Sequence, residues 1–518
     1  MVREIAAARA DKRVDNPLEM SARPSRLVLL QPLLCRLAPA VAIFCFLSWC
    51  FIAVRSDFSW DDSEPEILNL AWRLAHGESI YRGIDGPPYA FAAYPPVYFA
   101  VVAGLMKLTG LSFLPAKLLS FLAALSIGWA LVRLNREWNK QGQGGLWAAC
   151  LLFLIPAFLY NALRSQVQML AVALSIWSLI LFMRNRRIET LVLSPLLAVL
   201  AFYTKQTQIA LPLGMAIYLA LRNRRWFIPY VSVVVVSGLI PFIWLQRVTG
   251  GNFFLDTVQL ARLNYHVRMI PLIFMHHAGP MVIFIVVACS LFYRRIRNAK
   301  PEPIDCYFAG VFFLTLLSLG RVGAHGQYVL ELLVVTMIYL LRATDLPTVR
   351  GREAWVAAQV LLLILYAPAF VFLEEGLWDI PANRASSEIY SMIRTQSGPI
   401  LSQQGSFPLF GRGEIYIQLF HFAELSQSGL WDQSQVLNEI FRRRFSYVIT
   451  EFPIEKPAME ETIKERFTPE MISALQKSYR RAAVFYPYFV YTPLNSIDAH
   501  CLNRSRDTGI AKAKIRLH

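Results

Sequence analysis

The sequence predicts a mainly α fold: a polytopic helical membrane protein with about eleven transmembrane helices and a small α/β C-terminal domain on the outer face. Three observations lead to this prediction. Hydrophobic residues make up 56% of the 518 residues, whereas a soluble domain has about 45–50%. The mean hydropathy is +0.42. Lys and Arg gather in short clusters at the ends of apolar segments, where they favour the cytoplasmic side of a membrane.

These clusters also account for the formal net charge of +16. Once they are assigned to membrane topology, no exposed basic groove remains, which argues against nucleic acid as a partner. The seven cysteines lie mostly in or beside apolar segments, and they form neither a CxxC pattern nor a disulfide framework.

The chain divides into three parts by this reasoning. Residues 1–36 are a basic cytoplasmic tail, and the following apolar run is an uncleaved anchor because no small-residue cleavage site follows it. Residues 37–373 are the transmembrane domain, with a first outer loop at 55–114. Residues 374–518 are a soluble periplasmic α/β domain.

A membrane span needs about 20 apolar residues, and the basic clusters fix the direction of each predicted span. Under this rule the N-terminus lies inside and the C-terminal domain outside. An eighth span ends at Arg294 and a tenth ends at Arg342. The remaining spans are Leu37–Val54, Pro115–Leu134, Leu146–Leu163, Val167–Met183, Leu191–Tyr203, Ile209–Leu221, Ile228–Leu245, Tyr307–Leu319 and Ala354–Leu373.

Two further regions are assigned outside the spans. Tyr94–Gly110 contains Pro95, Pro96 and Lys107, and as a span it would move every later basic cluster to the outer face. It is therefore predicted to lie on the outer membrane surface as an interfacial helix. Gln246–His277 is predicted as an outer loop.

The C-terminal part has the pattern of a small α/β domain. The segments ILS at 400–402, SYVITEF at 446–452 and VFYPYFVYTP at 484–493 are strand-like. Ile415–Leu425 and Gln435–Phe445 are amphipathic, which favours helices.

The acidic stretch WDDSEPE, from Trp60 to Glu66, follows the first span directly. Ser63 and Glu66 have capping-box spacing, and Gly77 supplies a stop, so a helix is expected between them. The positive end of that helix favours an ionised Asp62, which suits a general base. The alternative is a solvated loop in which Asp61, Asp62 and Glu64 have no catalytic role.

Three polar turns are predicted at the same outer edge as this stretch. They carry cations and amides that could stabilise a phosphate leaving group. Each also has a structural alternative: a snorkelling lysine, a helix end and a plain turn. Glu331 would be costly unless paired, so Arg321 or Lys205 is its expected partner. The residues are Arg164, Gln166 and Gln168; Lys205 and Gln206; and Arg321, His325, Gln327 and Tyr328 with Glu331.

An outer loop with His266, His276 and His277 could contact an anionic acceptor. The adjacent pair invites a metal site, but no further ligands occur at suitable spacing. No metal or other cofactor is therefore predicted.

Several segments, quoted at the end of this paragraph in chain order, resemble the bacterial membrane glycosyltransferases of the GT-C fold, in the protein O-mannosyltransferase and aminoarabinose-transferase superfamily. The resemblance covers most of the chain. It rests on WDDSEPEILNLAWRLAHGESIY, FAAYPPVYFAVVAGLMKLTG, LPAKLLSFLAAL, FYTKQTQIALPL and GRVGAHGQYVLELL.

This resemblance implies a polyprenyl-phosphate sugar donor and a catalytic acid in the first outer loop. Asp62 is the best match, with Asp61 and Glu64 adjacent to it. Family members often have Glu directly after the Asp, whereas Ser63 follows here. Tyr94 resembles the family's tyrosine-proline start of the interfacial helix, and Lys117 stands where a basic residue commonly begins the next span.

The resulting hypothesis is an inverting transfer of a sugar to an acceptor on the outer face of a bacterial inner membrane. A lipid phosphate leaves readily as an anion, so one carboxylate base suffices, whereas glycoside hydrolysis needs two carboxyl groups. The acceptor could be a lipid-linked saccharide, lipopolysaccharide, a cell-wall glycan or a protein. The alternative is a transporter or flippase of a lipid-linked or anionic solute, although no internal repeat is evident.

Overall fold

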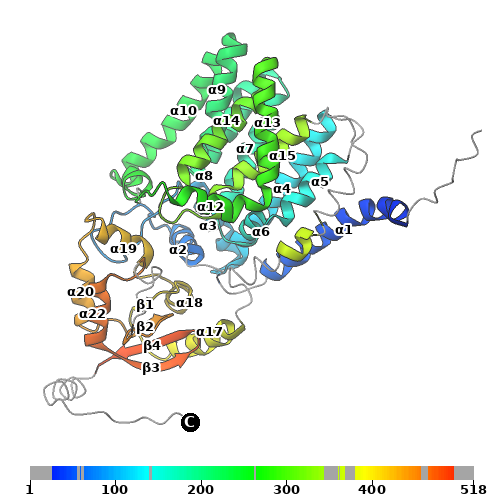
Figure 1. Cartoon of the computed structure of the whole chain (residues 1–518). Helices are drawn as coiled ribbons and strands as arrows, with labels where there is room; N and C mark the ends of the chain where they lie inside the picture. Colours follow the sequence, from blue (N-terminus) through cyan, green and yellow to red (C-terminus); the bar gives the residue numbers. More distant parts are fainter. Residues whose placement is uncertain are drawn as a thin grey trace, which may run out of the picture.

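A bundle of helices and a smaller α/β unit make up the computed structural model, with two short helices at the base of the bundle (Figure 1). The α/β unit begins at α17 (Ile380–Ile393), and the short helices are α2 (Ser63–Ala75) and α3 (Val97–Thr109). The structure describes residues 26–54, 59, 63–138, 143–261, 264–343, 360, 362–367, 380–456 and 465–494.

Apolar helices of 8 to 29 residues form the bundle, and mainly aliphatic and aromatic side chains fill its core. Its helices are α1 (Arg26–Val54), α4 (Leu114–Trp138), α5 (Gly144–Leu154), α6 (Pro156–Leu163), α7 (Val167–Met183), α8 (Ser194–Thr204), α9 (Ala210–Arg222), α10 (Arg224–Val248), α12 (Met269–Ala278), α13 (Val282–Asn298), α14 (Pro303–Ser318) and α15 (Leu330–Ala343). α4 packs against α5 and α7, α7 packs against α8, and α14 packs against α9 and α15. Short helical turns join some of them: η1 (Glu189–Leu193), α11 (Asn252–Phe254), η2 (Leu255–Gln259), η3 (Gly279–Met281) and η4 (Gly326–Tyr328).

Four helical segments in the described part of the chain are long and apolar enough to cross a membrane: Leu37–Val54, Leu114–Trp138, Arg224–Val248 and Met269–Asn298. The bent pair α5 and α6 would add a fifth if both halves belong to one span. The prediction of a mainly helical membrane protein is confirmed, whereas the count of about eleven spans stays a prediction. Most of the eleventh predicted span, Ala354–Leu373, lies outside the described residues.

Three predicted segments differ in detail. Leu146–Leu163 is not one straight helix, because Pro156 cannot continue the backbone hydrogen bonding and instead begins α6 after a 74° bend. The outer loop predicted at 246–277 is partly helical, since its apolar run MIPLIFM forms the first part of α12. α1 begins at Arg26 and so extends into the predicted tail.

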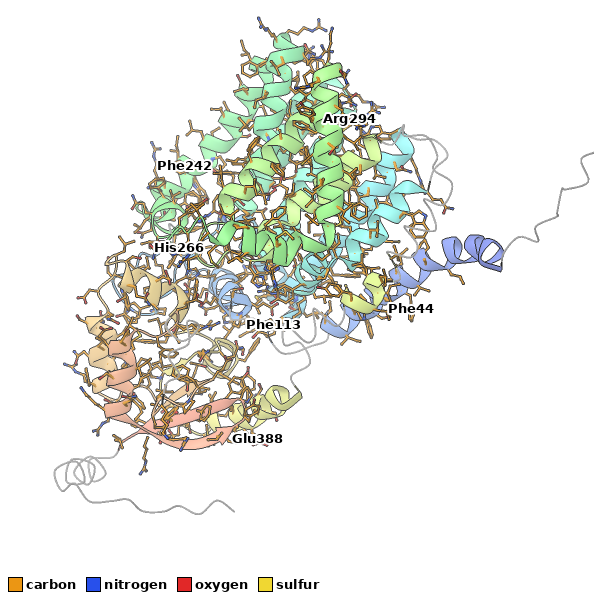
Figure 2. All side chains as sticks on the ribbon, in the orientation of Figure 1. Phe44, Phe113, Phe242, His266, Arg294 and Glu388 are labelled. Atoms are coloured by element: carbon orange, nitrogen blue, oxygen red, sulfur yellow. The ribbon has the colours of Figure 1, made fainter. Side chains whose placement is uncertain are left out.

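One end of the bundle gathers the arginines that follow two of the predicted spans. Arg342 Nη2 lies 2.9 Å from Glu302 Oε1, and Arg295 Nε lies 3.0 Å from Asp305 Oδ2. Glu302 and Asp305 form a capping box at the start of α14. Figure 2 places Arg294 at this end, far from the α/β unit, and Phe113 near that unit. Basic clusters from separate segments therefore meet at one end, as the charge rule requires.

A four-stranded mixed sheet is the centre of the α/β unit, with the order β1-β2-β4-β3. β1 (Ile400–Ser402) pairs in parallel with β2 (Tyr447–Thr450), and β4 (Tyr488–Pro493) pairs antiparallel with β2 and with β3 (Tyr479–Phe485). All three strand-like segments of the sequence contain strands. The other helices of the unit are α18 (Ser406–Arg412), α19 (Leu419–Gln427), α20 (Ser434–Phe441) and α22 (Pro469–Ser478).

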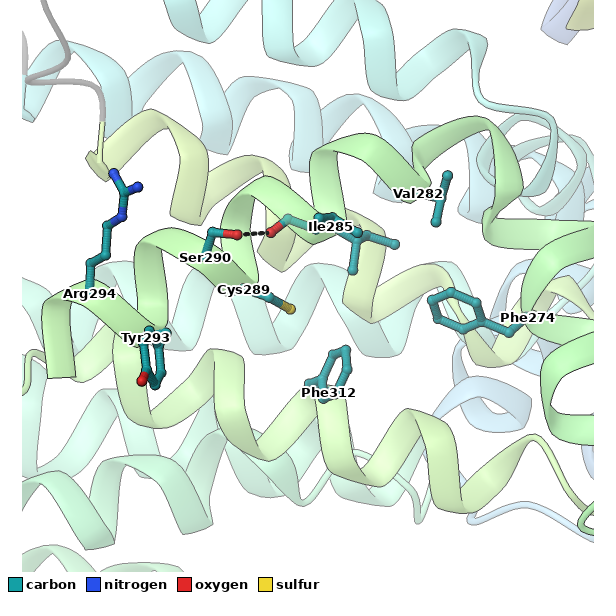
Figure 3. Close-up of a pocket in the computed structure, with 9 residues that line it drawn as sticks. Phe274, Val282, Ile285, Cys289, Ser290, Tyr293, Arg294 and Phe312 are labelled. Atoms are coloured by element: carbon teal, nitrogen blue, oxygen red, sulfur yellow. Dashed lines mark hydrogen bonds between the residues drawn. The ribbon is translucent and has the colours of Figure 1, made fainter. Parts of the chain in front are cut away.

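A surface cavity of about 580 Å³ opens along α13, with walls that reach α12 and α14 (Figure 3). Mainly apolar side chains line it, including Phe274 and Phe312, and Arg294 lies at one end. None of the predicted site residues lines this cavity.

Candidate active site

The helix predicted after the acidic stretch is α2, which begins at Ser63 and ends at Ala75. Its buried face includes Ile67, Leu70 and Ala71, and Gly77 follows with a φ of +81°, a backbone conformation that glycine adopts without strain. Asp61 and Asp62 lie outside the described residues. Asp62 directly precedes the first residue of α2 in the sequence.

The turn between α6 and α7 binds the start of α2. The Ser63 hydroxyl accepts hydrogen bonds from Arg164 Nη2 at 3.2 Å and from Gln166 Nε2 at 2.5 Å. Glu64 is fully buried, and its Oε1 accepts a hydrogen bond from the Ser165 amide at 2.6 Å. The Ser63 hydroxyl therefore joins the start of α2 to the bundle, whereas the capping role expected of Ser63 stays a prediction.

Arg164 and His325 approach each other beside this turn. The Arg164 guanidinium carbon lies 4.2 Å from the centroid of the Tyr160 ring, and the His325 ring lies 5.9 Å from the same ring. Burial and the Arg164 charge lower the pKa of His325 to about 4. His325 is therefore neutral near pH 7, and Arg164 supplies the positive charge here.

A second cation, Lys205, is buried at the C-terminal end of α8. Its Nζ donates a hydrogen bond to Gln168 Oε1. Nζ also lies 4.4 Å from the centroid of the Tyr328 ring and 5.9 Å from that of Tyr94. Burial, with a smaller contribution from the Arg321 charge, lowers the pKa of Lys205 to about 7, while the Glu331 charge opposes this shift.

Glu331 is held by a tyrosine. The Tyr307 hydroxyl donates a hydrogen bond to Glu331 Oε1 at 2.7 Å, and both residues are buried. The expected ion pair with Arg321 or Lys205 is not the main contact, although the Lys205 charge acts on this carboxylate. Tyr307 lies inside the predicted span 307–319, where apolar neighbours gave no sign of this role.

Four of the predicted binding residues lie apart from these contacts or join them only indirectly. Lys117 Nζ donates to the Ala53 carbonyl at 3.3 Å and lies near the end of α1. Gln206 Nε2 donates to the Ala93 carbonyl at 2.8 Å and to the Thr257 carbonyl at 3.1 Å, so it ties loops together. Arg321 Nη2 donates to the Ala261 carbonyl, while its charge reaches Tyr94 and Tyr328. Gln327 lies in η4 and is partly buried.

Asp256 is an acidic residue of this region that sequence reasoning missed. It lies in η2, is fully buried, and has the backbone amides of Arg82 and Ala92 near its carboxylate. Burial raises its pKa to about 7, which outweighs the effect of these amides. A single acid inside a predicted outer loop carries no sequence signal, because loop carboxylates are usually solvated.

The described residues hold no group of three or more His, Cys, Asp or Glu side chains placed to bind a metal ion. The His276 and His277 rings lie 4.5 Å apart, and His277 lies 4.4 Å from His325. These three residues form a cluster of rings at the base of the bundle, next to Arg164.

The fold is similar to that of ArnT from Cupriavidus metallidurans. The apo structure of ArnT matches with a TM-score of 0.62 and 13% sequence identity, over 88% of this chain and 98% of ArnT. The structure of ArnT bound to undecaprenyl phosphate matches with a TM-score of 0.61 and the same identity and coverage.

The family model of dolichyl-phosphate-mannose-protein mannosyltransferase matches residues 93–245. This range contains Tyr94, Lys117, Arg164 and Lys205. No curated protein matches the chain by sequence. The resemblance inferred from the sequence is confirmed: most of the chain has the fold of ArnT, and residues 93–245 match the mannosyltransferase family model.

Proposed function

We propose that this protein is a glycosyltransferase of the bacterial inner membrane. It transfers a sugar, with inversion, from a polyprenyl-phosphate donor to an acceptor hydroxyl on the outer face. The observation that carries this proposal is the meeting of three separate polar turns: the turn with Arg164 and Gln166 binds the start of α2, and Lys205 contacts Gln168 and Tyr328. These turns bring Arg164, Lys205 and Arg321 to one end of an apolar bundle. The structure of ArnT with undecaprenyl phosphate supports a lipid-phosphate donor.

The reaction requires one base and a site for an anion. The acceptor oxygen attacks the anomeric carbon while Asp62 takes the hydroxyl proton. The bond between that carbon and the phosphate oxygen breaks, and its electron pair leaves with the lipid phosphate. Since the phosphate is a stable anion, no general acid is required.

The buried cations would stabilise the phosphate during this step. Lys205 lies among Tyr94, Tyr328 and Gln168, where few waters compete for its charge. Arg164 lies next to Ser63, one residue after Asp62. Glu64 is a poorer base than Asp62, because it is buried and already accepts the Ser165 amide. It is better suited to fixing the start of α2.

Replacing Asp62 by Asn tests the proposal. We expect transfer to fall by about 10²–10⁴-fold, because general base catalysis typically contributes this factor. The assay is mass spectrometry of envelope glycans in a deletion strain that expresses each variant at equal membrane abundance. Asp85→Asn is the matched control, because Asp85 is an exposed acid of the same loop. Normal product with Asp62→Asn would exclude the assigned base.

A second experiment distinguishes sugar transfer from lipid flipping. Purified protein in liposomes that carry labelled polyprenyl-phosphate sugar should form a new glycosidic bond when membrane extract supplies the acceptor. Movement of label between leaflets without any glycosylated product would instead support a flippase.

A further inference from the structure

The α/β unit contacts the first outer loop through backbone pairing. The Tyr89 amide donates to the Tyr416 carbonyl at 2.7 Å, and the Gln418 amide donates to the Tyr89 carbonyl at 3.0 Å. These bonds form a parallel bridge between Tyr89 and Ile417. The buried Gln418 side chain also accepts the Phe91 amide at 3.2 Å. The unit therefore supplies hydrogen-bond partners for the backbone groups of Tyr89 and Phe91.

The same unit reaches α2 directly. Asn69, fully buried in the middle of α2, accepts the Ile415 amide at 3.2 Å through Oδ1. His421 Nε2 lies 3.8 Å from Glu66 Oε2. Leu409 and Ile415 belong to the apolar core that surrounds α2 and α3. Contacts with the unit thus extend over the first two turns of the helix.

Two neighbouring residues of the unit contact the chain before and after the pair Asp61 and Asp62. Gln404 Oε1 accepts a hydrogen bond from the Ser59 hydroxyl at 3.0 Å, just before Asp61 and Asp62 in the sequence. Gly405 lies against Pro65, just after them. A Cβ at residue 405 would lie 3.2 Å from Pro65 Cβ and 3.0 Å from Ile415 Cδ1, so glycine permits this close approach.

The start of α2 is consequently held from two sides. Arg164, Ser165 and Gln166 of the bundle bind Ser63 and Glu64, as described above. Gln404 and Gly405 of the α/β unit contact Ser59 and Pro65. A base must be held to within a fraction of an ångström, since a 1 Å displacement costs about 10²-fold in rate.

We propose that the α/β unit positions the start of α2, which directly follows Asp62 in the sequence, and that Gln404 and Gly405 are positioning residues for this end of the helix. The claim that these residues support catalysis rests on the proposed function, whereas the claim that they order α2 does not. If the unit served only to bind an acceptor, or only to stabilise the chain, loss of the Gln404 contact would leave the order of α2 unchanged.

The test compares two adjacent glutamines in the full-length protein. Gln404→Ala removes the contact with Ser59. Gln403→Ala is the matched control, because Gln403 bonds with Glu451 inside the α/β unit, at 2.9 and 3.0 Å. Hydrogen exchange of residues 63–75 measures the order of α2, binding of undecaprenyl phosphate measures the anion site, and the envelope glycan measures transfer.

We expect Gln404→Ala to raise exchange in 63–75 and to lower transfer by about 10- to 100-fold, while undecaprenyl phosphate still binds. Gln403→Ala should leave both α2 exchange and transfer unchanged. Ser59→Ala should match Gln404→Ala, and the double variant should add little, because both changes remove the same hydrogen bond. Gly405→Ala provides a second disruption if Gln404→Ala does not accumulate in the membrane.

Three results would overturn the inference: unchanged α2 exchange in the Gln404 and Gly405 variants, raised exchange with full transfer, or equal effects of Gln403→Ala and Gln404→Ala. If the wild-type protein makes no glycan product, the proposed function fails. The exchange measurement then still decides whether the unit orders α2.

Discussion

Single side chains in the candidate site fall into two groups with different tasks. Arg164 and Gln166 bind the Ser63 hydroxyl and so fix the start of α2. Lys205, with Tyr94 and Tyr328 around it, forms a buried positive site. A lysine whose pKa lies near neutrality can lose its charge over the pH range of an ordinary assay.

The pH dependence of anion binding should reveal this lysine. Burial lowers the pKa of Lys205 to about 7, and a bound phosphate favours its protonated form. The affinity for undecaprenyl phosphate should therefore fall by up to about tenfold per unit as the pH rises from 7 to 9. Titration calorimetry in detergent measures this dependence.

Variants assign the effect to one group. Lys205→Arg should bind with little dependence on pH over that range, because arginine stays charged, and Lys205→Met should bind weakly throughout. Lys107→Met is a control, since Lys107 is exposed on α3. A wild-type affinity that is constant from pH 7 to 9 would show that Lys205 does not bind the phosphate.

Helix packing in the bundle depends on close backbone approach at a few small residues. Gly145, in the first turn of α5, faces α4. A Cβ there would lie 2.7 Å from the Leu131 carbonyl oxygen and 2.7 Å from Val132 Cα. Backbone atoms cannot move aside as a flexible side chain can. The contact between α4 and α5 therefore requires glycine.

Gly145→Ala should destabilise the protein by about 1–3 kcal/mol, the usual cost of overpacking a core. Thermal unfolding of the detergent-solubilised protein measures the effect. Gly104→Ala in α3 is the matched control, because nothing lies within 4 Å of its added Cβ. That change should be neutral or stabilising by about 0.5–1 kcal/mol, since alanine favours a helix. Equal melting temperatures for the two variants would contradict this account of the packing.

At the scale of the whole molecule, the positions of the charged residues predict how the protein is oriented in the membrane. Arg295 and Arg342 meet acidic partners at one end of the bundle, while the α/β unit lies against the other. The charge rule places the first end in the cytoplasm.

Cysteine labelling in a cysteine-free background tests that orientation. Ser428→Cys in the α/β unit should react with a membrane-impermeant maleimide in intact spheroplasts. Asn298→Cys, at the arginine-rich end, should react only after permeabilisation. Both positions are exposed, so burial does not explain a difference. The reverse pattern would show that the topology is inverted.

Periodicity and charge identified the apolar helices and the strand segments, because both features depend on local sequence. The sequence shows Pro156, but the bend there is not predicted, because this proline falls inside the predicted span Leu146–Leu163. The partner of Glu331 could not be found, since Tyr307 lies 24 residues away within another apolar helix. Likewise, no local pattern linked Asn69 to Ile415, which are 346 residues apart. Side-chain contacts between distant helices depend on tertiary packing.

The pairing of Tyr89 with residues 416–418 also has a consequence for biosynthesis. Phe91 and Gln418 are 327 residues apart, so the ribosome adds that length of chain before the loop can find its partner. At roughly 5–20 residues per second, this takes about 16–65 s. During that interval Tyr89 and Phe91 lack the apolar cover that they have in the finished protein. The newly made loop would be a target for chaperones or proteases, and a nascent chain would not become active before its α/β unit was made.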